Sequence, residues 1–228
     1  MIMAKAAGKA RRGRLDNADL VAGSHALLRA LKRVGVTFDV SGTESLGLRQ
    51  GPFVFAANHV SPLETQVLPA ILEAAAPCTF IVKEGLTRYP ILGPVLRAFD
   101  PIIVGRTDPR ADLDLVLREG TARLKRGISV IVFPQAHRAP RFDPRGFNSL
   151  GMRLARRAGV PLVPIALETT AWTPGGLIRD IGWIVPARPA RFAIGLPTPV
   201  EANGNEAHRH VVSFIENQLA EWAAGKGG

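Results

Sequence analysis

Short apolar segments without a polar face are the feature that most constrains the fold of this chain. Residues 53–57, 78–82, 128–133 and 162–167 are almost entirely apolar or β-branched. A strand with one face in water alternates apolar and polar side chains, so continuous apolar strands indicate a sheet covered on both faces. Amphipathic helical segments separate these strands. We therefore predict an α/β domain with a mostly parallel central sheet flanked by helices.

The remaining predicted elements complete this alternation. The predicted strands are residues 36–40, 53–57, 78–82, 101–104, 128–133, 162–167 and 191–194. The predicted helices are residues 16–34, 62–75 (kinked at Pro69), 91–98, 108–126, 147–158 and 205–223. A chain of 228 residues with 46% apolar residues suits one domain with a substantial core. We assign residues 1–15 to a flexible basic arm, 16–35 to an amphipathic N-terminal helix and 36–228 to a single α/β domain.

The charge of the chain favours anionic partners. Lys and Arg outnumber Asp and Glu by 29 to 19, which gives a net charge of +10. Such a surface attracts phosphates, acidic lipid headgroups or nucleic acid. The five basic residues of the arm each contribute about 1 kcal/mol near an anionic leaflet. The helix over 16–35 either lies on a membrane or docks on the domain's own core.

Cysteine usage and hydropathy indicate the compartment. Cys78 is the one cysteine, so no internal disulfide forms and a reducing compartment is expected. We find neither the apolar stretch of a signal peptide nor an uninterrupted run of about 18 apolar residues. We therefore expect a cytoplasmic protein associated peripherally with the membrane.

The segment from Asn58 to Glu64 carries the first chemical signal. His59 follows an apolar strand, and Glu64 lies one turn into the next helix. An imidazole takes up a proton near neutral pH, and a carboxylate fixes its tautomer, so the pair suits a general base. The same residues also fit a capping box with Ser61 as the N-cap, in which Glu64 only satisfies a backbone N–H. The two interpretations are compatible, because a carboxylate has two acceptor oxygens.

Polar and basic residues follow three further strands. They are Lys83, Arg106 and the group Gln135, His137 and Arg138. Ligands of open α/β sheets bind at the carboxyl ends of the strands. We therefore expect these side chains to share one edge with His59, where they combine a general base with a cradle for an anion.

These residues together resemble the glycerolphosphate acyltransferase family, also known as the lysophospholipid acyltransferases. Its first motif, Asn-His, four residues and Asp, is similar to Asn58-His59 through Glu64. Its second motif resembles residues 102–106, and its third, Phe-Pro-Glu-Gly-Thr-Arg, resembles residues 133–138. Its fourth resembles residues 160–165. The motifs occur in order across roughly residues 36–200, and the resemblance implies a fold and activity of this family.

The resemblance also implies residue roles. In the family, a lysine and arginines at the positions of Lys83, Arg106 and Arg138 hold the acceptor's phosphate. Three departures are visible in this chain. Glu64 replaces aspartate, Gln135 replaces glutamate and thereby removes a charge, and the pair Ala136 and His137 replaces glycine and threonine. The cations are retained, whereas the altered third motif leaves the identity of the acceptor open.

We therefore predict an O-acyltransferase similar to the 1-acylglycerol-3-phosphate acyltransferases, active in phospholipid biosynthesis. His59 and Glu64 are the predicted catalytic residues. The predicted substrate-binding residues are Asn58, Lys83, Arg106, Gln135, His137 and Arg138. His59 removes a proton from a hydroxyl of a lyso-lipid acceptor, which attacks the thioester of acyl-CoA or an acyl-carrier protein, and no cofactor is required. Glu64 stabilises the imidazolium, as the carboxylate does in serine hydrolase triads.

Three other hypotheses compete with this prediction. A metal site formed by His59, Glu64 and His137 lacks a His/Cys pair at ligand spacing. A nucleic-acid-binding protein would explain the charge, but only 6% of residues are aromatic and no recognition motif is visible. A non-catalytic lipid-binding relative at the membrane surface would explain the altered third motif, and this is the strongest alternative.

Overall fold

The computed structural model describes residues 8–13, 15–47, 51–75, 77–90, 92–135, 137–175, 182–201 and 203–225. Within these residues, seven strands form one sheet in the order β1-β7-β6-β2-β5-β3-β4. The strands are β1 (Phe38–Ser41), β2 (Val54–Ala57), β3 (Cys78–Lys83), β4 (Ile102–Val104), β5 (Ser129–Val132), β6 (Leu162–Glu168) and β7 (Ala190–Ile194). The predicted strands all occur, with bounds that differ by one or two residues.

Most neighbouring strands run in the same direction. The five strands β6, β2, β5, β3 and β4 are mutually parallel. The single reversal in the described sheet lies between β6 and β7, which pair antiparallel, and β1 pairs parallel with β7. The prediction of a mostly parallel α/β sheet is confirmed.

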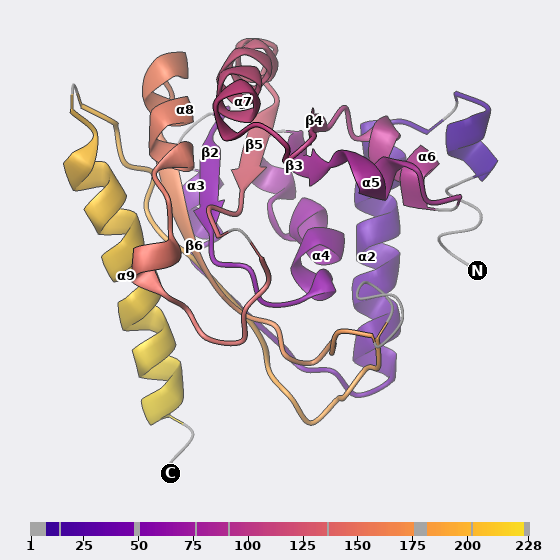
Figure 1. The fold of residues 1–228 in the computed structure, drawn as a ribbon. Helices are drawn as coiled ribbons and strands as arrows, with labels where there is room; N and C mark the ends of the chain where they lie inside the picture. The colour runs from indigo at the N-terminus through magenta and orange to yellow at the C-terminus, as the bar shows by residue number, and fades with distance from the viewer. Residues whose placement is uncertain are drawn as a thin grey trace.

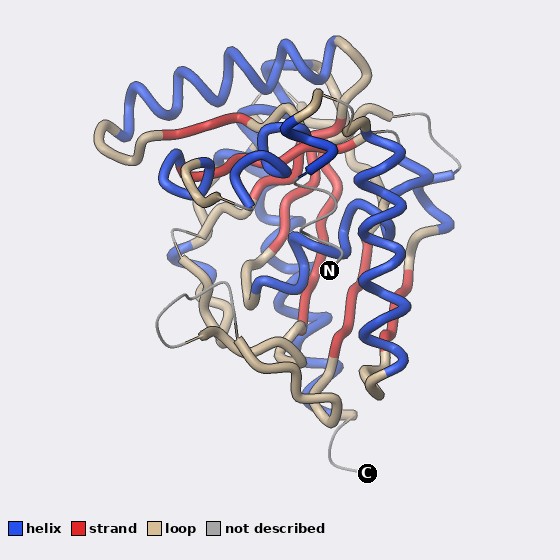
Figure 2. Tube along the Cα trace, turned by 90° about the vertical axis from the view of Figure 1, so that its right-hand side faces the viewer, coloured by secondary structure: helices blue, strands red, loops and turns tan. Residues whose placement is uncertain are grey.

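Helices cover both faces of the sheet (Figure 1). The helices are α2 (Asn17–Arg33), α3 (Glu44–Gly47), α4 (Pro62–Ile71), α5 (Glu84–Thr87), α6 (Leu92–Ala98), α7 (Pro109–Lys125), α8 (Leu150–Ala158) and α9 (Asn205–Ala224), with short 3₁₀ turns at Glu73–Ala75 and Pro144–Gly146. One core cluster contains residues of α2 and α4, and a second contains residues of α7, α8 and α9. Figure 2, turned by 90°, shows the strands enclosed by helices.

The central strand shows why its sequence has no polar face. Phe55 of β2 points into the cluster under α2 and α4, whereas Val54 and Ala56 point into the cluster under α7, α8 and α9. Every residue of β2 is buried. Because both faces are covered, both sets of alternating side chains must be apolar, as the sequence predicted.

One predicted helix ends earlier in the structure, and two short helices occur that were not predicted. The helix predicted over 62–75 ends at Ile71, and the chain continues as a 3₁₀ turn, so Pro69 precedes a helix end instead of a kink. Proline lacks the N–H that the helix needs, and this weakens the last turn. The short helices α3 and α5 were not predicted, because four residues are too few to show a helical period.

The helix predicted over 16–34 is α2, and it lies on α4. Ser24 is buried, and its Oγ donates to the carbonyl of Gln66 at 2.7 Å and accepts the N–H of Ala70 at 3.2 Å. These bonds join the two helices and satisfy buried polar groups. The helix α2 therefore docks on the domain, as one of the two alternatives predicted. Contact of α2 with a membrane stays a prediction.

Part of the predicted basic arm has structure of its own. Residues 8–11 form a helical turn. Lys9 pairs with Asp19 of α2 at 2.7 Å, and the Arg11 guanidinium donates to the carbonyl of Pro90 at 2.6 Å. Residues 1–7 and 14 of the arm, like Ala136 of the third motif, lie outside the described residues. The predicted flexibility of the arm therefore stays a prediction.

Two further findings concern the reactivity of Cys78 and the hydropathy of the helices. Burial raises the pKa of the Cys78 thiol to about 12, which keeps this cysteine protonated and unreactive at neutral pH. No helix in the described part of the chain combines the length and the apolar character needed to cross a bilayer.

Candidate active site

The carboxyl ends of five parallel strands meet at one edge of the sheet. The loops after β2 and β5 run below these two strands in Figure 1. β2 lies between β5 and β6, so residues that follow these three strands are neighbours in space. The predicted site residues that follow β2, β3, β4 and β5 accordingly lie along this one edge.

His59 and Glu64 form the central contact of the site. His59 Nδ1 lies 2.9 Å from Glu64 Oε1. The helix α4 begins with the predicted capping box, in which Ser61 Oγ accepts the N–H of Leu63 at 3.1 Å while Glu64 reaches back to the N–H of Ser61. Glu64 therefore caps the helix and orients the imidazole at the same time, so both interpretations of the sequence apply.

The Glu64 carboxylate is fully buried and surrounded by hydrogen-bond donors. Oε1 accepts the backbone N–H groups of Val60 at 2.6 Å and Ser61 at 2.9 Å in addition to His59. Oε2 accepts the hydroxyl of Ser61 at 3.0 Å and the hydroxyl of Thr169. These donors replace the water that burial removes.

Burial and hydrogen bonding act on Glu64 in opposite directions. Burial raises the pKa of the Glu64 carboxyl, whereas the hydrogen bond and charge of His59, the Thr169 hydroxyl and the Ser61 N–H lower it. The net pKa of Glu64 lies below its ordinary value, so the carboxylate is ionised at neutral pH. An ionised carboxylate can hold the proton on Nδ1 and stabilise a positive imidazole ring.

The imidazole ring of His59 stacks on aromatic side chains. His59 stacks on Phe133 with a centroid distance of 4.2 Å and an interplanar angle of 20°. Phe133 in turn stacks on Phe80 at 6.4 Å. The His59 side chain is 16% exposed, and within the described residues its Nε2 has no hydrogen-bond partner. With Nδ1 bonded to Glu64, Nε2 is the nitrogen available to a substrate.

The backbone of His59 is held by the loop that follows β5. The His59 N–H donates to Gln135 Oε1 at 2.8 Å, and the N–H of Ala139 donates to the His59 carbonyl at 2.9 Å. Gln135 is buried. The structure thus places Gln135, a predicted substrate-binding residue, against the loop after β2 that carries His59. We call this loop the base loop.

Asn58 links the base loop to the opposite neighbour of β2. Its Nδ2 donates to the carbonyl of Leu167 and its Oδ1 accepts the N–H of Leu167, both at 2.8 Å. Asn58 is buried, and its side chain continues the pairing of β2 with β6 beyond the end of β2. This geometry positions His59, while a direct contact of Asn58 with substrate stays a prediction.

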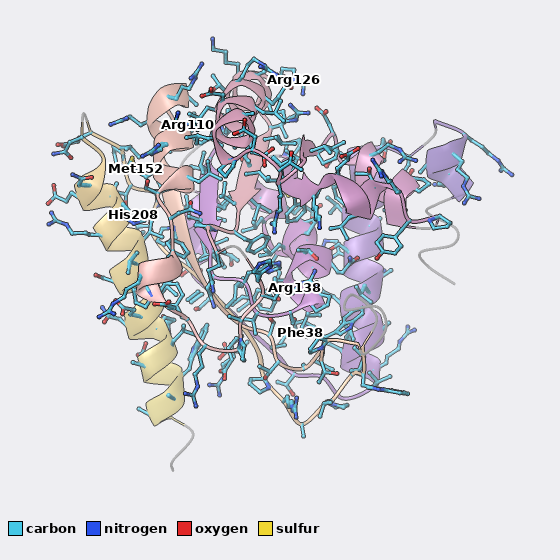
Figure 3. All side chains as sticks on the ribbon, viewed as in Figure 1. Phe38, Arg110, Arg126, Arg138, Met152 and His208 are labelled. Atoms are coloured by element: carbon cyan, nitrogen blue, oxygen red, sulfur yellow. The ribbon has the colours of Figure 1, made fainter. Side chains whose placement is uncertain are left out.

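The predicted cations lie at increasing distances from β2. Strands are about 4.8 Å apart, so the strand order places the exit of β5 beside His59, that of β3 about 10 Å away and that of β4 about 14 Å away. Arg138 follows β5 and precedes Ala139, which holds His59. Figure 3 shows Arg138 in the lower half of the molecule, whereas Arg110 and Arg126 lie near its top.

Lys83 and Arg106 lie farther along the same edge. Lys83 is the exposed last residue of β3. Arg106 is exposed and has a left-handed backbone with φ of 61°, and Asp112 accepts its N–H at 2.8 Å. His137 is exposed. The described residues contain no group of three or more His, Cys, Asp or Glu side chains that could hold a metal ion.

Thr169 was not predicted as a site residue. It follows β6, is fully buried and donates to Glu64. The rule applied to the other parallel strands, that side chains directly after a strand meet at the edge, would have found it. The prediction ended this strand at Leu167 and did not extend the rule to β6.

The fold and the His-x4-Glu pair at its carboxyl edge define the class of glycerolphosphate-type acyltransferases. The chain belongs to the acyltransferase family: residues 37–168 match the family model described as Acyltransferase. The predicted family and the predicted enzyme class, acyltransferases similar to the 1-acylglycerol-3-phosphate acyltransferases, are confirmed.

Named relatives agree with this assignment. A 1-acyl-sn-glycerol-3-phosphate acyltransferase of Pseudomonas aeruginosa is 29% identical over 191 residues, 82% of this chain and 70% of that protein. A chloroplastic 1-acyl-sn-glycerol-3-phosphate acyltransferase of Brassica napus is 31% identical over 58% of this chain, and this match spans 37% of the plant protein.

A solved structure shows the same fold. The crystal structure of the 1-acyl-sn-glycerophosphate (LPA) acyltransferase PlsC from Thermotoga maritima superposes with a TM-score of 0.70 at 22% identity. The superposition covers 91% of this chain and 81% of that chain. The predicted glycerolphosphate acyltransferase-like fold is therefore confirmed.

Proposed function

We propose that this protein transfers an acyl group from a thioester donor to a hydroxyl of an anionic lyso-lipid, with His59 as the general base. The observation that carries this proposal is the 2.9 Å bond between His59 Nδ1 and the buried Glu64 carboxylate. The names of the relatives make 1-acylglycerol-3-phosphate the first acceptor to test. The stacked, clamped imidazole supports the role of a fixed base.

The proposed reaction uses Nε2 of His59. Nε2 takes the proton of the acceptor hydroxyl as the oxygen attacks the thioester carbonyl. The carbon–sulfur bond then breaks, and the leaving thiolate takes the proton from the imidazolium, so the base is regenerated. Glu64 holds the Nδ1 proton throughout and stabilises the positive ring. The base contributes on the order of 10²–10⁴ in rate.

The acceptor's anionic group requires cations beside the base. Arg138 is the first candidate, because it lies on the loop that holds the His59 carbonyl through Ala139. Lys83 and Arg106 lie farther along the edge, where they suit the outer part of a headgroup or the phosphates of the donor. Their contribution is orientation of the reacting hydroxyl. We also propose that Gln135 and His137, which follow β5, take part in acceptor binding.

The acceptor is a membrane lipid, so we place the reaction at an anionic membrane surface on the cytoplasmic side. The net charge of +10 and the basic residues near the N-terminus support this location. Acyl-CoA and acyl-carrier protein present the same thioester, and the proposed chemistry serves both donors without a cofactor.

The decisive experiment incubates the purified protein with radiolabelled acyl-CoA or acyl-carrier protein and a panel of lyso-lipids. We expect lysophosphatidate to gain the label, with one free thiol released for each acyl group transferred. His59→Ala should lower turnover by at least about 10² while its circular dichroism matches that of the unchanged protein. Near-normal turnover in His59→Ala would refute the base. Vesicle binding without any acyl transfer would favour the non-catalytic lipid-binding alternative.

A further inference from the structure

We propose that Thr169 is a positioning residue whose hydroxyl holds the Glu64 carboxylate and thereby sets the pH at which the His59–Glu64 pair takes up a proton. The inference rests on the proposed function, because it assigns Thr169 a part in tuning the general base.

The contact joins two distant segments. Thr169 lies directly after β6, and its Oγ1 donates to Glu64 Oε2, 105 residues away in the sequence. Both side chains are fully buried. His59 binds the other carboxylate oxygen, Oε1. Thr169 and His59 therefore hold opposite oxygens of one carboxylate.

The two hydroxyl groups that hydrogen-bond to Glu64, those of Ser61 and Thr169, differ in their other hydrogen bonds. Ser61 Oγ accepts the N–H of Leu63 and so caps α4. It also lies 3.0 Å from both Glu64 Oε2 and Thr169 Oγ1. In the described structure the Thr169 hydroxyl forms hydrogen bonds only with Ser61 and Glu64. Replacing Thr169 therefore changes the carboxylate's surroundings without removing a helix cap, which replacing Ser61 would do.

The effect of the hydroxyl follows from charge. A hydrogen bond to an ionised group is about twice as strong as one between neutral groups, and it draws negative charge toward the donor. Without Thr169, more of this charge remains available to His59. His59 is the one described charged or titratable group that acts on Glu64, since its other neighbours are backbone N–H groups and hydroxyls. The pair then holds its proton more tightly, and the midpoint of its titration moves to higher pH.

The test compares Thr169→Val with Thr169→Ser, which keeps the hydroxyl, and with Thr170→Val, a partly buried neighbour that is not among the groups acting on the Glu64 carboxyl. The first readout is the acid limb of the pH profile of kcat/KM. The second is the pH titration of the His59 Cε1–H resonance by NMR, assigned by its absence in His59→Gln. The NMR readout requires no turnover.

We expect Thr169→Val to move both midpoints upward by about 1 to 2 pH units, the range that loss of one hydrogen bond to a charged group gives. Thr169→Ser and Thr170→Val should keep the midpoints of the unchanged protein. If Thr169→Val does not fold, Thr169→Ala removes the same hydroxyl without adding a methyl group in its place.

Two outcomes would overturn the proposal. Unchanged midpoints in folded Thr169→Val or Thr169→Ala would show that the hydroxyl does not act on the pair. A uniform fall of kcat/KM at every pH, without a shift of the NMR midpoint, would show that Thr169 serves packing alone. Absence of acyl transfer in the unchanged protein would refute the proposed function, while the NMR titration would still decide the role of Thr169.

Discussion

Gln135 and His59 are joined by a hydrogen bond of 2.8 Å from the backbone N–H of His59 to the side-chain oxygen of Gln135. This bond holds the base loop against the exit of β5. Where the family motif has glutamate, this chain has an amide. An amide oxygen and a carboxylate oxygen can both accept this N–H, so the replacement keeps the contact and removes the charge.

This relationship predicts different results for two variants of Gln135. Gln135→Glu keeps an acceptor oxygen and should retain acyl transfer within about threefold, with an effect mainly on KM for the anionic acceptor. Gln135→Leu leaves the partly buried His59 N–H unpaired, which costs about 1–3 kcal/mol, and should lower kcat by tenfold or more. Steady-state kinetics and chemical unfolding measure both. Equal kcat in the two variants would show that the hydrogen bond between the His59 N–H and Gln135 does not hold the catalytic histidine in place.

Asn58 provides a second test of how the base is held. Asn58→Ala removes both bonds to Leu167 and leaves two buried backbone groups without side-chain partners. We expect a loss of about 2–4 kcal/mol in the free energy of unfolding. Urea denaturation measures this loss. Asn217→Ala on the exposed face of α9 is the matched control and should change stability by less than about 0.5 kcal/mol. A small effect at Asn58 would mean that the β2 exit is held mainly by its other contacts.

The lowered pKa of Glu64 predicts how stability depends on pH. The folded-state pKa lies below the ordinary value of 4.5, so the unfolded chain binds the proton first as the pH falls. The contribution of Glu64 is therefore complete above about pH 4.5 and is lost as the pH falls through the folded-state pKa. Denaturation curves between pH 7 and 3 should show this loss, and Glu64→Gln should reduce its slope.

Glu64→Gln also separates the two roles of this residue. A glutamine can still accept the N–H of Ser61, so α4 should remain capped. It cannot stabilise a positive imidazole, and kcat should fall by 10² or more at neutral pH. Acyl transfer at the unchanged rate would reduce Glu64 to a helix cap.

The sequence predicted the parts of the site that depend on local order. The apolar strands at 53–57 and 162–167 showed burial on both faces, and the Ser61-Pro62-Leu63-Glu64 segment showed the start of α4. The reversal between β6 and β7 was not predicted, because an apolar pattern shows that a strand is buried and not which neighbour it pairs with. The contacts of Gln135 and Thr169 with the His59–Glu64 pair depend on which strands are neighbours in the sheet. These contacts were therefore visible only in the structure.

The long separations within the site have a consequence for biosynthesis. The bonds of Asn58 and Glu64 to the exit of β6 span 109 and 105 residues, and β6 in turn pairs with β7 through residue 194. During translation the segment that carries His59 leaves the ribosome before the later residues that hold this histidine in position. The imidazole therefore gains its working geometry only after the chain has been made beyond residue 169, and a nascent fragment lacking β6 has no fully formed proton acceptor.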